Sequence, residues 1–393
     1  MSSINLNDGG DVAYCMPGGL EFQRMYAKVH GYIALMICLL GSVANSVNIA
    51  VLSRKEMASS TNSILTALAV ADLIVMLDYI PFALHIYIKI FTELNRNSYA
   101  WAVFVYFHSI FSQTLHTTSI WLTITLAVWR FIAIKFPQKN RTLCNKQNTR
   151  IAIGVAYAVC PILCLPIYFA MNIQEVPPDS IGNDTSVENE TLSINASMNS
   201  DPTEAMYAIS MTSNKELLTA IFWIYSVFIK LIPCVVLSIL SVLLILKMKS
   251  SDRRRQKLCT RSTTAMGVGS WSGGEGITSG IRKKHTKTLK KGGGRTDRTT
   301  RMLVALLGLF LATELPQALF GLLTAIAPHL FEVCYYAFGE VMDLMALVGS
   351  AVNFVLYCSM SRQFRSTFTR LARKMLPLPT RQDSEPLTTT STT

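Results

Sequence analysis

Residues 30–53 read HGYIALMICLLGSVANSVNIAVLS, a stretch without a charged side chain. An α-helix rises about 1.5 Å per residue, so a run of this length crosses the roughly 30 Å hydrocarbon core of a bilayer. Because lipid offers no partners to backbone N–H and C=O groups, and the alternating pattern of a membrane barrel is absent, such runs predict transmembrane helices. Seven of them occur, at 30–53, 62–88, 99–134, 151–171, 217–247, 300–326 and 333–358. We therefore expect an all-α seven-helix bundle over 30–358.

The composition also indicates a membrane protein. Half of the 393 residues are hydrophobic, 15% are charged and the mean hydropathy is +0.35, a balance that does not fit an ordinary soluble domain. A net charge of +12 would suggest nucleic-acid binding, but thirty of the 36 Lys and Arg side chains lie on one side of the expected bundle. Cations favour the cytoplasmic flanks of transmembrane helices. We therefore expect a multi-pass plasma-membrane protein with its amino terminus outside and no nucleic-acid partner.

The segments outside the apolar runs divide into an outer and an inner group. Residues 1–29 are the expected extracellular amino terminus, and 172–216 form an outer loop whose Asn-x-Ser/Thr sequons predict glycosylation. The sequons begin at Asn183, Asn189 and Asn195. The inner loop 248–299 is rich in Gly, Ser, Thr, Lys and Arg, so we expect it to be disordered. The tail 375–393 is either a phosphorylated segment or a solvated terminus.

Two of the nine cysteines lie on the expected outer side, Cys15 in the amino terminus and Cys334 at the start of the seventh run. The outside of a cell is oxidising, so we expect these two to form a disulfide, with two free thiols as the alternative.

Six Asp, Glu and Lys side chains lie well inside the apolar runs, where a charge is costly and marks a functional site by default. They are Asp72, Asp78, Lys230, Glu314, Glu340 and Asp343. Four neutral polar residues share the depth of Asp72, namely Asn45, Ser119, Ser350 and Asn353. A carboxylate among neutral oxygens suits a sodium ion or a proton and a switch between two helix packings. A hydrogen-bonded network that only fixes helix register is the alternative.

Short motifs in six of the seven runs are similar to those of a known family. They are Gly41-Ser-Val-Ala-Asn45, Leu68-Ala-Val-Ala-Asp72, Trp129-Arg130-Phe131, Pro233, Phe310 with Pro316, and Asn353-Phe-Val-Leu-Tyr357. In their order and placement, over about 30–373, they resemble the rhodopsin-like G-protein-coupled receptors. The resemblance implies an extracellular ligand, an intracellular heterotrimeric G protein, and receptor kinases and arrestin as further partners.

Three motifs depart from the pattern of that family. Trp129 stands where an acid usually precedes the arginine, Phe354 replaces the proline of Asn-Pro-x-x-Tyr, and Glu314 replaces a tryptophan before Leu-Pro. The run at 151–171 also lacks its customary tryptophan. We therefore expect an unusual resting contact for Arg130 and no proline kink in the seventh helix.

The disulfide that usually joins helix three to the second outer loop is also missing. Val105 occupies the expected cysteine position, and no cysteine occurs between residues 165 and 232. A Cys15–Cys334 bridge is the expected replacement.

Further motifs narrow the resemblance to the invertebrate myosuppressin receptors. They are Tyr14-Cys15, His30-Gly31-Tyr32, 60–65 (STNSIL), Tyr79-Ile-Pro81-Phe82, 116–123 (HTTSIWLT), 296–302 (TDRTTRM) and 357–364 (YCSMSRQF). This resemblance implies a short amidated peptide agonist with an Arg-Phe-amide type end, and coupling to inhibitory G proteins. The alternatives are a receptor for another amidated peptide and a seven-helix scaffold that does not signal.

An arginine in the ligand requires a carboxylate partner, and a phenylalanine-amide requires an aromatic pocket. Asp343 or Asp78 is the preferred partner, while Glu314 is either a ligand contact or the neutralised partner of Lys230. The candidate contacts are Asp78, Tyr79, Phe82, His85, His108, Ser112, His116, Glu314, Gln317, Glu340 and Asp343. Plain interhelical packing is the alternative for the aromatic members, and the histidines lack the partners of a metal site.

At the inner end we expect Arg130 to contact the G protein, with an interfacial arginine that reaches toward water as the alternative. Tyr357 joins the switch residues around Asp72. The stretch 361–374 carries Phe364, Phe368 and Leu371 at helical spacing, so it predicts an amphipathic helix on the inner leaflet.

Three other functional classes do not fit the sequence. An opsin needs a Schiff-base lysine in the seventh helix, and 333–358 contains no lysine. A transporter is expected to show internal repeats with broken half-helices, and an intramembrane enzyme needs a nucleophile with its base or a metal cluster. Neither pattern occurs, so we expect a receptor with no cofactor beyond a sodium ion at Asp72.

Overall fold

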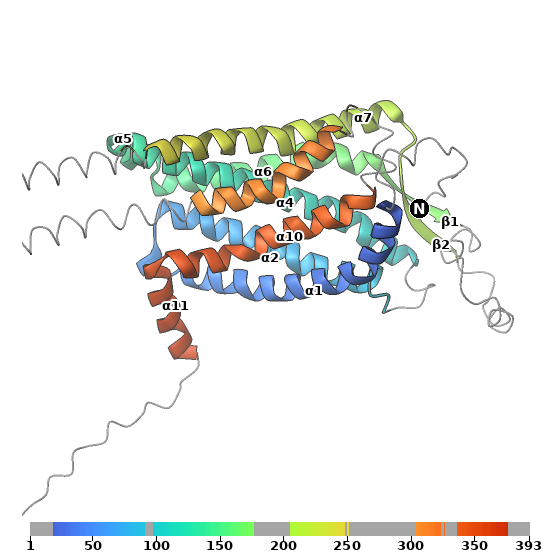
Figure 1. Ribbon diagram of the computed structural model, residues 1–393, viewed down its shortest axis with the longest axis horizontal. Helices are drawn as coiled ribbons and strands as arrows, with labels where there is room; N and C mark the ends of the chain where they lie inside the picture. Colours follow the sequence, from blue (N-terminus) through green and yellow to red (C-terminus); the bar gives the residue numbers. More distant parts are fainter. Residues whose placement is uncertain are drawn as a thin grey trace, which may run out of the picture.

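The computed structural model describes residues 19–90, 97–176, 205–247, 250, 304–323, 326 and 336–375. Seven helices in this part of the chain are long and apolar enough to cross a membrane, which confirms the predicted fold class. They are Arg24–Leu52, Ser60–Ile86, Tyr99–Lys135, Lys146–Ala170, Glu216–Lys247, Val304–Leu323 and Phe338–Ser359. The helices lie side by side in one elongated bundle (Figure 1).

The elements follow one another along the chain as helices, with one pair of strands before the fifth span. They are α1 (Gly19–Leu52), η2 (Lys55–Met57), α2 (Ser60–Ile86), α4 (Tyr99–Lys135), α5 (Pro137–Leu143), α6 (Lys146–Ala170), β1 (Met171–Val176), β2 (Met206–Met211), α7 (Lys215–Trp223), η5 (Ile224–Leu231), α10 (Tyr336–Met360) and α11 (Arg362–Met375). The fifth span runs through α7 and η5 to Lys247, and the sixth is Val304–Leu323. The end of the bundle that carries β1 and β2 is called the hairpin end, and the opposite end the α11 end (Figure 1).

Two boundaries differ from the expectation from sequence. Helix α1 begins at Gly19, so the helix that contains the first apolar run extends back into the segment 1–29. Hydropathy marks only the turns of a helix that lie in lipid, whereas backbone hydrogen bonding continues into water. The segment 172–216 was expected to be a loop, but β1 and β2 pair antiparallel from Met171 opposite Met211 to Val176 opposite Met206.

Side-chain caps explain where several helices start. The side chain of Ser59 accepts a hydrogen bond from the backbone N of Asn62 at the start of α2. Asn145 does the same for Asn148 before α6, at 2.7 Å. Asn214 accepts from two backbone N–H groups at the start of α7. Each cap satisfies backbone donors that a helix leaves unpaired in its first turn.

The fifth span contains the π-helical segment η5, in which the N–H of Ile232 donates to the C=O of Val227. Pro233 follows directly, and proline has no N–H to donate to the preceding turn. The wider turn rotates the side chains of η5 relative to a regular helix, and such segments frequently occur at functional sites.

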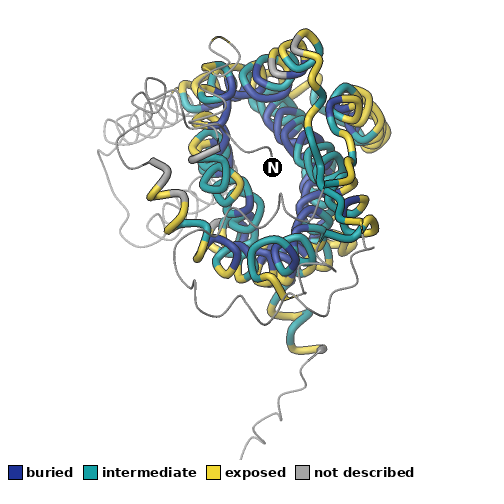
Figure 2. Tube along the Cα trace, turned by 90° about the vertical axis from the view of Figure 1, so that its right-hand side faces the viewer, coloured by how far each residue is buried: buried dark blue, intermediate teal, exposed yellow. Residues whose placement is uncertain are grey.

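Buried residues face the inside of the ring of helices and exposed residues face outward (Figure 2). Two hydrophobic clusters fill the bundle. One includes Leu68, Leu122 and Tyr357, and the other includes Val75, Leu115 and Leu347. Along α2, α4 and α10 the residues between these clusters include Asp72, Ser119 and Asn353, so a polar layer separates the two apolar halves.

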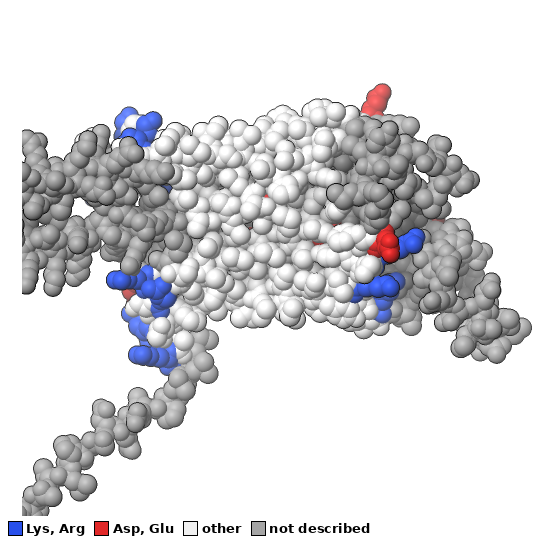
Figure 3. Space-filling model, in the orientation of Figure 1, with Lys and Arg blue, Asp and Glu red and all other residues white. Residues whose placement is uncertain are grey.

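On the face drawn in Figure 3, the middle of the bundle is a broad band with almost no charged side chain at the surface, and the Lys and Arg side chains visible there lie at the two ends, mostly at the α11 end. An apolar band of this kind matches the hydrocarbon region of a bilayer. The chain is therefore a multi-pass membrane protein.

Candidate functional site

A cluster of histidine and aromatic rings joins α2 to α4 near the hairpin end. His108 Nδ1 lies 2.7 Å from Asp78 Oδ2, and both side chains are almost fully buried. The His108 ring stacks on Phe82, with centroids 4.0 Å apart, and meets the edge of Tyr79. Asp78 therefore already has a hydrogen-bonded basic partner.

Two further histidines extend this cluster. His30 Nε2 on α1 lies 3.1 Å from the Tyr79 hydroxyl, and His85 stacks on Trp101 at 3.9 Å between centroids. The structure therefore brings the predicted Tyr79, His85 and His108 together, packed against their neighbours. Ser112 is half-buried one turn below His108. Ligand contact by these residues stays a prediction, and His30 is a member that the list of candidates missed.

Two carboxylates on α10 differ from Asp78 in their surroundings. Asp343 is exposed, yet it lies within electrostatic reach of the buried Lys230 and His108. Groups buried in the bundle are close to it, so Asp343 faces the interior rather than lipid. Glu340, one turn away, has a buried Oε2 without a hydrogen-bond partner in the part of the chain that the structure describes. Among the described residues, neither carboxylate forms a salt bridge like that of Asp78 with His108.

A buried ion pair connects the fifth and sixth spans. Lys230 Nζ lies 2.6 Å from Glu314 Oε2, with side chains 1% and 3% exposed. The ammonium also donates to Gln317 Oε1 at 2.8 Å, and Gln317 Nε2 donates to the carbonyl of Met342 on α10 at 2.5 Å. Lys230 lies in η5, so the π-helical turn places its ammonium in this contact. The sequence-based alternative in which Lys230 neutralises Glu314 agrees with this geometry.

His116 on α4 completes the network of polar groups. Its Nε2 lies 3.1 Å from Glu314 Oε1 and 3.1 Å from Lys230 Nζ. One ring nitrogen cannot donate to the carboxylate and accept from the ammonium at the same time, so His116 Nε2 makes one of these two hydrogen bonds. Polar contacts thus join α4, the fifth span, the sixth span and α10.

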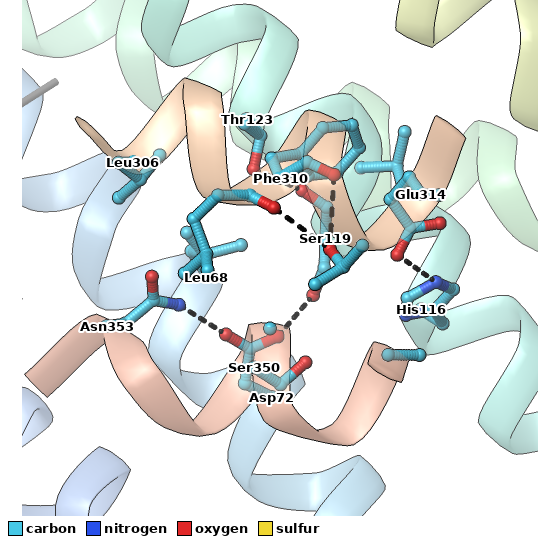
Figure 4. Close-up of a pocket in the computed structure, with 15 residues that line it drawn as sticks. Leu68, Asp72, His116, Ser119, Thr123, Leu306, Phe310, Glu314, Ser350 and Asn353 are labelled. Carbon is cyan, nitrogen blue, oxygen red and sulfur yellow. Dashed lines mark hydrogen bonds and ion pairs between the residues drawn. The ribbon is translucent and has the colours of Figure 1, made fainter. Parts of the chain in front are cut away.

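A cavity of about 40 Å³ lies between this network and Asp72 (Figure 4). His116 and Glu314 line it on one side and Asp72, Ser350 and Asn353 on the other. A cavity needs about 10–15 Å³ for one water, so this one accommodates a few waters or a partly hydrated small cation.

The predicted polar residues do surround Asp72, which is 3% exposed. Ser119 Oγ donates to Asp72 Oδ1 at 2.9 Å, and Asn353 Nδ2 donates to Oδ2 at 3.0 Å. Asn45 Nδ2 donates to the backbone carbonyl of Ser350 at 3.2 Å. Three helices, α2, α4 and α10, therefore meet at one carboxylate, and α1 joins them through the Ser350 carbonyl. This arrangement is compatible with both the ion-binding and the packing interpretation.

Comparison with known protein families shows to which family this seven-helix chain belongs. The family model described as serpentine type 7TM GPCR chemoreceptor Srw matches residues 32–266 and 279–374. The chain belongs to this family of G-protein-coupled receptors. It is a receptor rather than an enzyme, as predicted.

Several curated proteins are similar to this receptor along most of its length. The G-protein coupled receptor dmsr-1 of Caenorhabditis elegans is 29% identical, over 88% of this chain and 69% of the relative. The sex peptide receptor of Drosophila melanogaster is 26% identical, over 94% and 76%. The FMRFamide receptor of Drosophila melanogaster is 21% identical, over 89% and 54%. These similarities support the rhodopsin-like peptide-receptor class that the motifs indicated.

At the α11 end of the receptor, Trp129 stands where the family usually has an acid, and it forms a hydrogen bond to α6. Its Nε1 donates to Thr149 Oγ1 on α6 at 3.1 Å. The neighbouring Arg130 has a buried Nε that lacks a hydrogen-bond partner among the described residues. Replacing the acid with tryptophan therefore changes a charge contact on Arg130 into a link between α4 and α6.

Phe354, the second departure, packs against α11. Its ring lies 6.0 Å from Phe364 and 5.8 Å from Phe368, and Tyr357 also contacts Phe364. Phe364 is 1% exposed, so the apolar face of α11 is covered by α10 and the core. A proline at residue 354 would remove this ring contact.

Polar contacts tie α11 to the segment between α1 and α2. Gln363 Nε2 donates to the carbonyl of Glu56 at 2.7 Å, and Arg370 Nη2 lies 2.8 Å from Glu56 Oε1. A backbone hydrogen bond and the nearby Arg370 lower the pKa of Glu56 below its usual value. Glu56 is therefore ionised at neutral pH and keeps its attraction to Arg370.

Several predicted features lie outside the described residues. They are the disulfide partners Cys15 and Cys334, the glycosylation sites Asn183, Asn189 and Asn195, the loop 248–299 apart from residue 250, and the tail 376–393. The sequence also did not predict the interhelical contact of Trp129 or the π-helical segment η5. Hydrophobic periodicity does not reveal a single widened turn. Pro233, close to the intramembrane Lys230, was the one indirect indication of it in the sequence.

Proposed function

We propose that this receptor binds a short peptide with an amidated Arg-Phe carboxyl end, as myosuppressin-like peptides have, and activates a heterotrimeric G protein of the inhibitory type. The relatives named as FMRFamide receptor and sex peptide receptor support a peptide ligand. The observation that carries the proposal is the pair of α10 carboxylates, Glu340 and Asp343, which lie within electrostatic reach of His108 and Tyr26 in and next to the ring cluster.

Four carboxylates are candidate partners for the arginine of the peptide, and their existing contacts distinguish them. Asp78 is engaged by His108 and Glu314 by Lys230, so pairing either with a ligand would first break a buried contact. Asp343 is exposed to the interior and has no such contact among the described residues. A guanidinium binds a carboxylate through two parallel hydrogen bonds, which adds direction to charge. Asp343 is therefore the proposed partner, and the ring cluster takes the phenylalanine-amide.

Activation is proposed to be a shift between two packings of the bundle. Peptide bound at the hairpin end stabilises a packing in which the sixth span moves away from Arg130 and opens a cavity for the G protein. The bend lies at Glu314 and Pro316, where the sixth span is held by Lys230. A ligand shifts such an equilibrium only by its difference in affinity for the two states.

A sodium ion is proposed to favour the resting packing. The carboxylate of Asp72 and the hydroxyls of Ser119 and Ser350 border the cavity and supply the oxygen ligands that such a hard cation prefers. The ion would neutralise the Asp72 carboxylate while the polar layer of the bundle is packed closely around it.

The orientation follows from the charge distribution. The cation-rich α11 end is proposed to face the cytoplasm of a plasma-membrane receptor, with the amino terminus and β1–β2 outside. Receptor kinases and arrestin are then the proposed partners of the carboxyl-terminal tail, and lipid surrounds the apolar band.

G-protein activation in cells that express the chain tests the ligand class. The cells are titrated with an amidated Phe-Leu-Arg-Phe peptide and with its free acid, and surface expression is measured in parallel. A response to the amide alone supports the proposal, because an uncharged carboxyl end is then required. Silence toward both peptides, with the receptor on the surface, would favour another amidated peptide or a scaffold that does not signal.

A further inference from the structure

The paired strands β1 and β2 cannot be joined to α4 by the disulfide that is usual in related receptors. Val105 on α4 is not a cysteine, and residues 165–232 contain none either. The hairpin nevertheless lies against the start of α4, where two sets of tyrosine contacts occur.

The first set lies beside Val105. The Tyr106 hydroxyl donates to the backbone carbonyl of Tyr168 at 3.0 Å, and the two rings meet edge to face with centroids 5.4 Å apart. Tyr168 belongs to the last turn of α6, immediately before β1 begins at Met171. This contact therefore anchors the chain where it leaves α6 and enters the hairpin.

The second set lies at the start of α4. The backbone N–H of Tyr207 in β2 donates to the carbonyl of Asn97 at 2.8 Å. The Tyr207 ring meets the Tyr99 ring edge to face, with centroids 5.2 Å apart. The N–H of Thr212 also donates to the carbonyl of Ala170 at 2.8 Å, which closes the base of the strand pair. One tyrosine pair thus attaches β2 to the start of α4, and the other attaches to α4 the end of α6, from which β1 continues.

We propose that Tyr99, Tyr106, Tyr168 and Tyr207 form a tyrosine clamp that positions the hairpin beside the proposed peptide site at Asp343 and the ring cluster, in place of a disulfide. Unlike a covalent bridge, the clamp opens reversibly, so it governs how fast a bound peptide leaves. The effect on ligand release rests on the proposed peptide ligand, whereas the effect on the hairpin does not.

A simpler role for these tyrosines is anchoring at the membrane interface, where tyrosine is enriched. Tyr99 and Tyr168 are more than one-third exposed, which suits such a role. Interfacial anchoring gives no reason, however, for the Tyr106 hydroxyl to bond a backbone carbonyl of α6. The two roles predict different effects of removing that hydroxyl.

Amide hydrogen exchange of the full-length receptor in lipid nanodiscs tests the clamp without any ligand. Tyr106→Phe keeps the ring and removes the hydrogen bond, Tyr207→Ala removes a ring contact, and Tyr207→Phe keeps that ring. Tyr32→Phe, at an exposed tyrosine of α1, is the matched control. Exchange in 171–176 and 206–211 should accelerate about threefold or more in Tyr106→Phe and Tyr207→Ala, and stay at the wild-type rate in Tyr207→Phe and Tyr32→Phe.

The dissociation rate of a labelled amidated Phe-Leu-Arg-Phe peptide should rise in the same two variants. Unchanged exchange in Tyr106→Phe and Tyr207→Ala overturns the clamp, as does equal acceleration in Tyr207→Phe and Tyr207→Ala. If Tyr207→Ala does not fold, Tyr106→Phe alone decides. If the wild-type receptor does not bind the peptide, the proposed ligand is wrong, and the exchange rates still decide the clamp.

Discussion

At the scale of single residues, the partner of each buried carboxylate decides what it is able to bind. Asp78 lies 2.7 Å from His108 and Glu314 lies 2.6 Å from Lys230, so their charges are already compensated. Asp343 has only longer-range attraction from Lys230 and the histidines. An uncompensated charge in a partly enclosed site is costly, and a cationic ligand relieves that cost.

Asp343→Asn should therefore weaken the response to the amidated peptide. A hydrogen bond to a charged group contributes about 1.5–3 kcal/mol, so the half-maximal concentration should rise roughly tenfold to a hundredfold. The measurement is a dose-response curve for G-protein activation at matched surface expression. Glu56→Gln, at an exposed carboxylate on the α11 end, is the control and should leave potency unchanged. Equal potency of Asp343→Asn and wild type would remove Asp343 from the ligand site.

At the scale of elements, the Lys230–Glu314 pair links the fifth and sixth spans close to Pro316 of the sixth span. Gln317 extends the link to α10 through the carbonyl of Met342. Because the sixth span is expected to move on activation, this contact opposes the movement. The pair therefore contributes to the resting packing through its geometry more than through net stability.

Lys230→Met and Glu314→Leu should each destabilise the receptor, since either change leaves the other charge buried without its partner. The expected cost is about 3–5 kcal/mol for each single variant and close to zero for the double variant. Thermal unfolding of purified receptor measures this, with the two single and one double variant compared in one cycle. Additive losses in the double variant would show that the two side chains act independently.

Helix α11 depends on one aromatic residue of α10. Phe354→Ala should release α11, because aromatic contacts of about 0.5–1.5 kcal/mol each to Phe364 and Phe368 are lost. Hydrogen exchange in 362–375 should become faster, while Val355→Ala, at the neighbouring 60% exposed residue, should have no effect. Exchange that is the same in both variants would mean that lipid or Glu56 alone holds α11.

At the scale of the whole molecule, a polar layer divides the bundle into two apolar halves. The hydrophobic clusters on either side pack tightly, while the layer contains a cavity and a carboxylate shared by α2, α4 and α10. Packed cores have discrete arrangements rather than continuous ones, so a polar layer with a cavity is a natural place for the halves to change their relative positions.

Sodium should consequently lower the affinity of the receptor for the amidated peptide. Replacing a bulky organic cation with sodium at equal ionic strength should reduce peptide binding severalfold in the wild type. Asp72→Asn should abolish that dependence, because the variant lacks the carboxylate. Peptide competition binding in membranes is the measurement. A sodium effect that persists in Asp72→Asn would show that the ion acts at another site.

The seven spans and the polar residues around Asp72 could be predicted because lipid imposes local rules on the chain. A helix in lipid must be long and apolar, so Asp72 and Asn353 stood out from the residues around them. The helical turns before residue 30 and the β1–β2 pair were not predicted, since both extend into water, where hydropathy no longer distinguishes helix, strand and loop.

The sequence alone determined the membrane class, the helix count, the receptor family and which charges had to be explained. Only the tertiary structure decided which charged groups lie together. His108 pairs with Asp78 and Lys230 pairs with Glu314, whereas Asp343 forms no salt bridge among the described residues. The reason is physical. Crossing a bilayer is a property of consecutive residues, whereas pairing of side chains depends on helix rotation, on the widened turn at η5 and on packing between segments far apart in the chain.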